Sequence, residues 1–256
     1  METFQILLLI FLILFISIPI IGIVFFVKYV IKKSSSEQSI QLLDREKKEL
    51  ILKARSQRKN LIDWESKSIE KISNNLDYNF KKGFTRKFNG YIKTLNDERI
   101  ISFRRIDRGA SNATSRIIAV TSDFEIYYDH SGSETLIKYN GSYLGKIVNQ
   151  TNLVDMDNKN IGSINRNQNS LSSYIVKIQG QEIAYVVKNT DRRNFVRNRL
   201  YDFPAVNPYE KDIVRKREVV YADLLKLLRE PNENEYKWIT SIVIYEVIFY
   251  GIDFAL

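Results

Sequence analysis

The chain of 256 residues contains no cysteine, one histidine, four prolines and ten glycines. The missing cysteine excludes disulfides, thiolate-ligated zinc, iron–sulfur clusters, thiol catalysis and a lipid anchor on cysteine. The single histidine, His130, excludes a histidine-rich metal site and leaves one candidate for imidazole chemistry. The few glycines and prolines argue against low-complexity or collagen-like structure. We therefore expect no metal site and no cofactor.

Motifs of catalysis are also missing. No stretch matches a phosphate-binding loop, a dinucleotide fingerprint or a serine nucleophile elbow. The segment 155–160 begins like a calcium loop, but Lys159 stands at a ligand position and Asn160 stands where glycine belongs. His130 lies between Asp129 and Ser131, yet adjacency in sequence is not the geometry of a catalytic triad. We predict that the protein is not an enzyme.

The N-terminal segment is long and apolar. Residues 4–27 carry no charge, and about 20 apolar residues suffice to cross a bilayer. The segment lacks the basic start and the cleavage site of a signal peptide. Lys28, Lys32 and Lys33 follow it, and basic flanks stay on the cytoplasmic side. We predict that residues 1–36 form a transmembrane anchor and a polar hinge in a single-pass protein, with the C-terminal domain in the cytoplasm.

The next segment, 37–96, is predicted to be a charged helical stalk. Residues 37–80 contain no proline or glycine and are rich in residues compatible with a helix. Apolar side chains follow a seven-residue spacing at Ile40, Leu43, Leu50, Ala54, Leu61 and Trp64. This pattern fits a self-associating coiled coil, and it also fits a lone amphipathic helix that packs against the rest of the chain or another membrane subunit. Through residues 37–80 we expect a homo-oligomer or partners in a membrane complex.

Residues 97–256 change to a pattern of short strands and end in an apolar helix. Runs rich in isoleucine, valine, tyrosine and phenylalanine recur every eight to twelve residues, which is typical of an antiparallel sandwich or barrel. The stretch 238–256 carries only Glu246 and Asp253 as charges. A helix without a polar face must be surrounded by lipid or by protein. Glu246 near its centre favours protein, because a carboxylate in a bilayer is costly.

The strand-and-turn rhythm is clearest in Tyr143-Leu144-Gly145-Lys146-Ile147, in residues 153–164 and in Gly180-Gln181-Glu182-Ile183-Ala184. Over about residues 98–256 this pattern resembles the tubby C-terminal-like superfamily, which includes tubby proteins, phospholipid scramblases and plant LURP-one-related proteins. The resemblance implies a barrel of twelve strands around a C-terminal helix. The sequence pattern shows about ten strands, and its anchor is N-terminal, whereas scramblases are usually anchored through the C-terminal helix. No binding residue is carried over from the family.

The predicted fold class is thus an N-terminal transmembrane helix and helical stalk, followed by a mainly-β domain. That domain is expected to be an antiparallel tubby-like β-barrel that encloses a hydrophobic C-terminal helix.

Basic residues exceed acidic ones by nine, 39 against 30, which favours an anionic partner. They concentrate in residues 81–108 and 192–217, and the first cluster is interleaved with Phe80, Phe84 and Phe88 at a spacing that a helix would align. The candidate lipid-binding residues are Lys81, Lys82, Arg86, Lys87, Arg104, Arg105, Arg192, Arg193, Arg197, Arg215, Lys216 and Arg217. A solvated positive surface is the alternative interpretation.

Two functions follow from these observations. The first is a membrane-anchored, non-enzymatic binding module that contacts anionic lipid of the phosphoinositide kind through the basic clusters. The alternative is a structural or assembly subunit of a larger membrane complex, in which the stalk and the apolar surfaces pack on partners. Nucleic acid is not expected, because no motif of a nucleic-acid-binding domain accompanies the charge.

Overall fold

The computed structural model describes residues 15, 19, 21–23, 25, 28, 37–81, 85–109, 114–165, 173–187 and 221–252. The chain divides into two compact units, Met1–Ile51 and Leu52–Leu256, and the second contains the sheet. Helix α2 (Glu37–Arg55) crosses the division, and two short 3-10 helices, η1 (Arg58–Asn60) and η2 (Ser66–Lys71), follow it.

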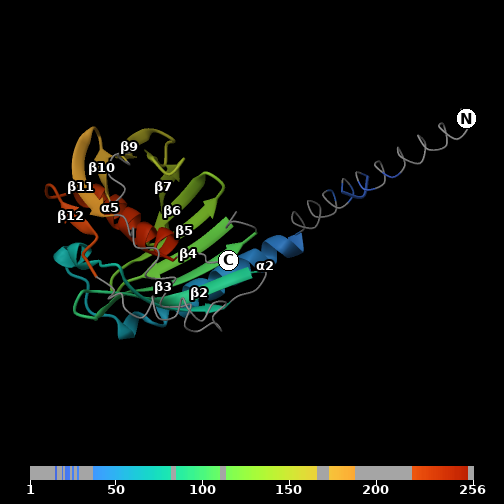
Figure 1. The fold of residues 1–256 in the computed structure, drawn as a ribbon, viewed down its shortest axis with the longest axis horizontal. Helices are drawn as coiled ribbons and strands as arrows, with labels where there is room; N and C mark the ends of the chain where they lie inside the picture. Colours follow the sequence, from blue (N-terminus) through green and yellow to red (C-terminus); the bar gives the residue numbers. More distant parts are fainter. Residues whose placement is uncertain are drawn as a thin grey trace, which may run out of the picture. The chain divides into compact units, whose positions relative to one another are not determined.

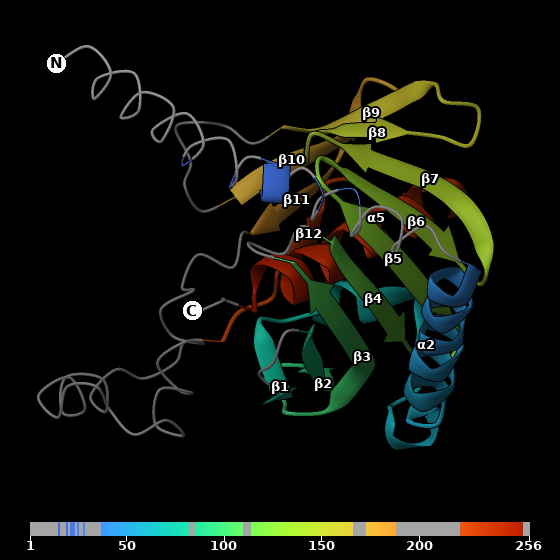
Figure 2. The same cartoon turned by 90° about the vertical axis from the view of Figure 1, so that its right-hand side faces the viewer.

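The second unit contains a twelve-stranded antiparallel sheet in which the strands follow one another in chain order (Figures 1 and 2). The strands are β1 (Asn75–Lys81), β2 (Thr85–Lys93), β3 (Arg99–Arg108), β4 (Thr114–Val120), β5 (Glu125–Ser131), β6 (Glu134–Tyr139), β7 (Ser142–Val148), β8 (Asn152–Val154), β9 (Asn160–Asn165), β10 (Ser173–Ile178), β11 (Gln181–Val187) and β12 (Leu225–Leu227). The two ends of the sheet are joined just before β1 and β12, where Ser73 and Asp223 form an antiparallel bridge. The backbone amide of Leu224 donates to the carbonyl of Ile72 beside this bridge (2.9 Å).

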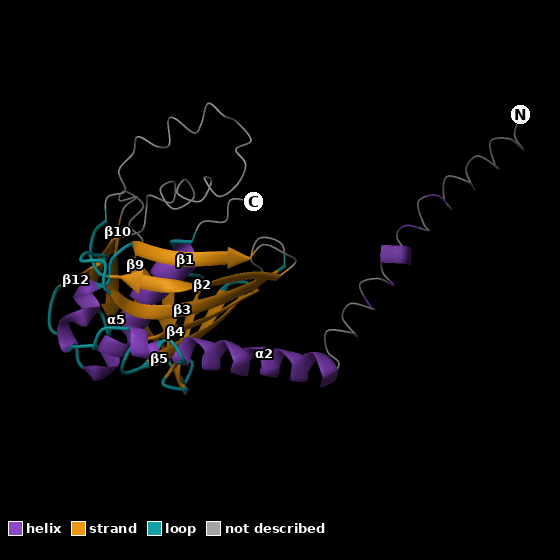
Figure 3. Ribbon diagram, turned by 90° about the horizontal axis from the view of Figure 1, so that it is seen from below, coloured by secondary structure: helices purple, strands orange, loops and turns teal. Residues whose placement is uncertain are grey.

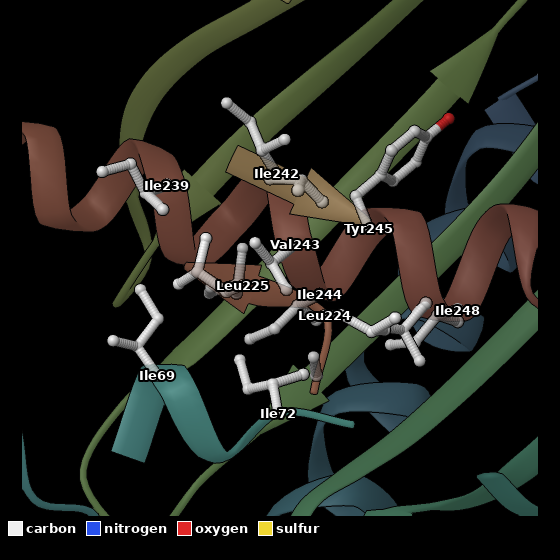
Figure 4. Packing of buried hydrophobic residues seen from close by; sticks show 14 of the residues in the cluster. Ile69, Ile72, Leu224, Leu225, Ile239, Ile242, Val243, Ile244, Tyr245 and Ile248 are labelled. Atoms are coloured by element: carbon white, nitrogen blue, oxygen red, sulfur yellow. The ribbon is translucent and has the colours of Figure 1, made fainter. Parts of the chain in front are cut away.

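The sheet curves around a C-terminal helix, α5 (Glu233–Tyr245), which continues as a π-helical turn, η4 (Glu246–Tyr250). Every residue from Trp238 to Ile248 is buried. Figure 4 shows apolar side chains of α5 together with Ile69 and Ile72 and with Leu224 and Leu225, which close the core from the side of η2 and β12. Because this part of the helix has no polar face, the sheet must surround it.

Trp238 packs directly on the backbone of β7. A Cβ atom at Gly145 would lie 2.7 Å from Cζ2 of Trp238 and 2.2 Å from the carbonyl oxygen of Val154, and the φ of Gly145 is +148°. Glycine is therefore required here both for its conformation and for the close approach of the indole ring.

The start of α5 is fixed by polar contacts. The side chain of Asn232 accepts from the amide of Glu235 (3.0 Å), and the carboxylate of Glu235 accepts from the amide of Asn232 (2.9 Å), which is a reciprocal capping box. Arg229 also donates to both carboxylate oxygens of Glu235, at 2.6 and 2.9 Å. These contacts set where the helix begins.

The predicted helical stalk is wrong. Helix α2 ends at Arg55, and residues 75–93 form the hairpin of β1 and β2, which Figure 3 shows beside β3. On β1, the half-buried Leu76, Tyr78 and Phe80 alternate with the exposed Asp77, Asn79 and Lys81, as expected for a strand with one face on a core. A helix of 19 residues is also too short for the predicted coiled coil, which required a helix over 37–80.

The predicted membrane location is corrected as well. Within the part of the chain that the structure describes, no helix is both long enough and apolar enough to cross a bilayer. Most of the predicted span, residues 4–27, lies outside the described residues. The prediction of a single-pass membrane protein with a cytoplasmic C-terminal domain is therefore withdrawn.

The hairpin predicts that Gly90→Ala destabilises the protein, whereas a helix at this position would predict the opposite sign. A Cβ at Gly90 would lie 2.1 Å from the carbonyl oxygen of Asp77 and 2.6 Å from Cα of Tyr78, so Gly90→Ala must push β1 and β2 apart. We expect it to lower the free energy of unfolding by about 1–3 kcal/mol. In a helix the same change would stabilise by about 1 kcal/mol. Chemical denaturation measures the difference.

Asn89→Ala is the matched control, because Asn89 precedes Gly90 on the same strand and points to the opposite face. It should change the free energy of unfolding by no more than about 0.5 kcal/mol. A stabilising effect of Gly90→Ala would contradict the hairpin.

Candidate functional site

The structure places five of the twelve candidate lipid-binding residues, and all five lie on β1, β2 and β3. They are Lys81, Arg86, Lys87, Arg104 and Arg105. The other seven lie outside the described residues: Lys82, Arg192, Arg193, Arg197, Arg215, Lys216 and Arg217. The second basic cluster therefore adds nothing to the geometry of the site.

Three basic residues lie in one row across four strands. Lys81 is opposite Lys87, Lys87 is opposite Ile106, and Ile106 is opposite Arg116. Residues that are opposite one another on neighbouring strands share a face of the sheet. Lys81 and Lys87 are exposed, so this row lies on the outer face, away from α5.

Two arginines of β3 flank this row. Arg104 and Arg108 lie two residues on either side of Ile106, so they share its face. Arg116 is 3.7 Å from the carboxylate of Asp129. Neither Lys81 nor Lys87 has an acidic partner among the described residues. We call Lys81, Lys87, Arg104, Arg108 and Arg116 the outer basic row.

Arg104 is half buried, and this burial lowers the pKa of its guanidinium from the usual value. Burial raises the free energy of the charged form, which an anion would offset. Tyr91, on the same face of β2, donates its hydroxyl to Oε1 of Gln57 (2.6 Å), and the guanidinium of Arg99 lies 4.4 Å from its ring centroid. The aromatic ring beside Arg104 is thus held in place.

Arg105 does not belong to this surface. Its side chain is fully buried on the inner face of β3, where Nε donates to Oδ1 of Asp107 (2.8 Å). Nη1 donates to the carbonyl oxygens of Ile248 (2.7 Å) and Phe249 (2.9 Å). The guanidinium also lies 4.7 Å from the ring centroid of Phe249. The Arg105 guanidinium therefore binds the negative end of the helix dipole.

The inner face carries a polar row of its own. Asp107 is opposite Arg86 and Ser115, His130 is opposite Ser115, and Thr135 is opposite His130. Four of the five side chains are buried to more than nine-tenths, and Arg86 is half buried. The row crosses five strands at the level where η4 ends. We call these five residues the inner polar row.

Burial dominates the electrostatics of this region. It lowers the pKa of Arg105, which the carboxylate of Asp107 counteracts. Burial also lowers the pKa of His130, and the charge of Arg105 adds to that effect. Burial raises the pKa of Tyr245 far above its usual value. Near neutral pH the histidine and the tyrosine are therefore uncharged. Arg105 and Asp107 form an ion pair, in which Nε lies 2.8 Å from Oδ1.

A small cavity of about 10 Å³ lies beside Thr135, Tyr174, Tyr245 and Glu246, which is room for one water molecule. Tyr174 donates to the carboxylate of Glu246 at 3.2 Å. Among the described residues, no three side chains of histidine, aspartate or glutamate lie close enough to bind a metal ion. Because Asp107 pairs with Arg105 and His130 lies within hydrogen-bonding distance of Thr135, the inner polar row fits a structural role, and the exposed lysines make the outer basic row the candidate binding site.

Sequence reasoning counted Arg108 in the basic cluster 81–108 but not among the candidate residues, and it missed Arg116. It also placed Arg104 and Arg105 in one cluster. The available signal was the period of two along β3, because adjacent residues of a strand point to opposite faces. Asp107 was not singled out from the sequence. Its pairing with Arg105 follows from the same period, since the two lie two residues apart.

Comparisons with known proteins add no relative: no protein family, no curated protein and no solved structure matches this chain.

The buried ion pair makes a prediction about stability. Asp107→Ala leaves the guanidinium of Arg105 buried without its carboxylate, and we expect a loss of about 3–5 kcal/mol in the free energy of unfolding. The matched control is Asp129→Ala, which breaks the partly exposed pair with Arg116. That change should cost less than about 1 kcal/mol. Equal losses in urea denaturation would contradict the anchoring role of Arg105 and Asp107.

Proposed function

We propose that the chain is a non-enzymatic binding module whose outer basic row contacts an anionic lipid headgroup of the phosphoinositide kind. The observation that carries the proposal is the cross-strand pair of Lys81 and Lys87, two exposed cations that lie opposite each other without an acidic partner among the described residues. Like charges in this position destabilise a sheet. An anion placed between them removes the repulsion.

The surroundings of this pair support the proposal. The cations of the outer basic row come from four adjacent strands, whose neighbours are about 5 Å apart. A group with several phosphates can therefore contact several of them at once. Arg104 supplies a planar, partly desolvated guanidinium, which suits phosphate oxygens better than a lysine does.

The resemblance to the tubby C-terminal-like superfamily stays a prediction, and it points to the same class of ligand. A curved twelve-stranded antiparallel sheet around a C-terminal helix is the arrangement that this resemblance implies. The proposal does not depend on it, because the outer basic row was built from the register of β1 to β4 alone.

The test is binding of the full chain to phosphatidylcholine vesicles with and without a phosphoinositide. We expect binding that the phosphoinositide strengthens and that salt weakens, since surface charges are screened. The triple variant Lys81→Gln, Lys87→Gln, Arg104→Gln should lose about 100-fold in affinity for these vesicles, because each surface cation contributes about 1 kcal/mol. Binding to pure phosphatidylcholine should not change.

The matched control removes three exposed lysines elsewhere, with Lys67→Gln on η2, Lys159→Gln between β8 and β9, and Lys226→Gln on β12. It should keep most of the affinity. An equal loss in both triple variants would mean that net charge acts and the outer basic row does not. If the phosphoinositide has no effect on the unmodified chain, the proposal fails. Recovery of the protein in a stable large assembly would then favour the alternative of a structural subunit.

A further inference from the structure

The only histidine of the chain lies in a triangle of hydrogen-bonding atoms inside the sheet. Nδ1 of His130 is 2.9 Å from Oγ1 of Thr135 and 3.1 Å from the hydroxyl oxygen of Tyr245, and these two oxygens are 3.1 Å apart. His130 and Thr135 belong to the inner polar row, whereas Tyr245 is the last residue of α5. The triangle therefore connects β5 and β6 to the helix.

The number of protons within the triangle decides which protonation state of the His130 ring fits. Thr135 and Tyr245 each bring one hydroxyl proton, and both protons find an acceptor within the triangle when Nδ1 is unprotonated. A proton on Nδ1 makes the ring a donor at this corner. One hydroxyl proton then has no acceptor in the triangle, whichever way the hydrogen bonds run. A buried donor without an acceptor is costly.

Burial and the nearest cation act in the same direction. Burial is the largest cause of the lowered pKa of His130, and Arg105 of β3 lowers this pKa more than either Asp107 of β3 or Asp129 of β5 raises it. The ring of Phe249 from η4 lies 4.5 Å from the imidazole, centroid to centroid. The other elements packed here bring the following groups: Arg86 of β2, Ser115 of β4, Thr135 of β6 and Tyr245 of α5.

We infer that this triangle is an acid-sensitive latch: neutral His130 holds the end of helix α5 and the turn η4 in the sheet, and its protonation releases them. The turn depends on contacts within one cluster, since Arg105 binds the carbonyl oxygens of Ile248 and Phe249, and Tyr245 and Phe249 stack at 4.8 Å. A second cation at His130 adds repulsion to Arg105 and removes a hydroxyl acceptor.

The direction of the pH dependence follows from the lowered pKa. The released form exposes an ordinary histidine with a pKa near 6.5, whereas the latched form has a lower pKa. The latch is therefore fully closed above about pH 6.5 and weakens as the pH falls toward the pKa of the latched form. Between these two values the equilibrium constant for release rises about tenfold for each pH unit.

Hydrogen exchange and NMR test the inference on the full chain. The ring signal of the single histidine needs no assignment, and it should titrate below pH 6.5. The amide of Gly251, which donates to the carbonyl oxygen of Glu246 (3.1 Å), reports release of η4. Its protection, corrected for the intrinsic exchange rate, should fall about tenfold per pH unit below pH 6.5. The amide of Gln179, which donates to Ile161 at the far end of β10, should keep its protection.

The variant His130→Gln cannot take up this proton, so the protection of Gly251 should become independent of pH between about 4.5 and 7. If this variant retains the pH dependence of the unmodified chain, carboxylates are responsible and the inference fails. It also fails if the ring titrates at or above pH 6.5, or if it titrates while Gly251 stays protected.

Should His130→Gln not fold, the double variant Thr135→Val, Tyr245→Phe removes both hydroxyls. The pKa of His130 should then rise toward 6.5, and an unchanged value would overturn the inference.

Discussion

The fold depends on one constraint, which is that the apolar surface of α5 must be covered on every side. From Trp238 to Ile248 no residue of the helix is accessible to solvent to a significant degree. Flat packing on a sheet covers one face of a helix and leaves the other exposed. A sheet that curves until its ends meet, as this one does at Ser73 and Asp223, covers all of them. The closing of the sheet is thus a consequence of the helix.

Apolar packing alone does not fix the position of such a helix along its axis inside the sheet, because one turn of isoleucine and valine resembles the next. The two ends of α5 are instead held by arginine and carboxylate groups. Arg229 and Glu235 define its start, and Arg105 with Asp107 holds the carbonyl oxygens of its last turn. The Arg105–Asp107 pair is fully buried, and separating such a pair is strongly destabilising, whereas the Arg229 side chain is 34% exposed. The buried pair therefore penalises a shift of the helix along its own axis.

The sequence was sufficient to predict the parts of the fold in which only one period fits the residues. The apolar run after Trp238 has no polar face, and strands such as β10 alternate, so a buried helix and a sheet followed directly. The hairpin of β1 and β2 was mistaken for a helix, because Phe80, Phe84 and Phe88 are four residues apart and such a spacing nearly aligns them on one helix face. Phe80 and Phe88 lie instead on two strands, opposite each other in the register of the hairpin. Their rings stack across the two strands at 4.8 Å.

The composition of the candidate site also depends on the two-residue period of a strand. Arg104 and Arg105 are adjacent in the sequence and were treated as one basic cluster, but the pleat of β3 sends one outward and the other inward. A charge outside the sheet costs little and is available to a ligand. A charge inside must be paired, and Asp107 provides the partner two residues later. Counting basic residues in a window cannot make this distinction, whereas the register can. Because Phe88 is opposite Arg105 and covers the core, Lys87 beside it must face outward, and the outer basic row is fixed by the packing of the inside.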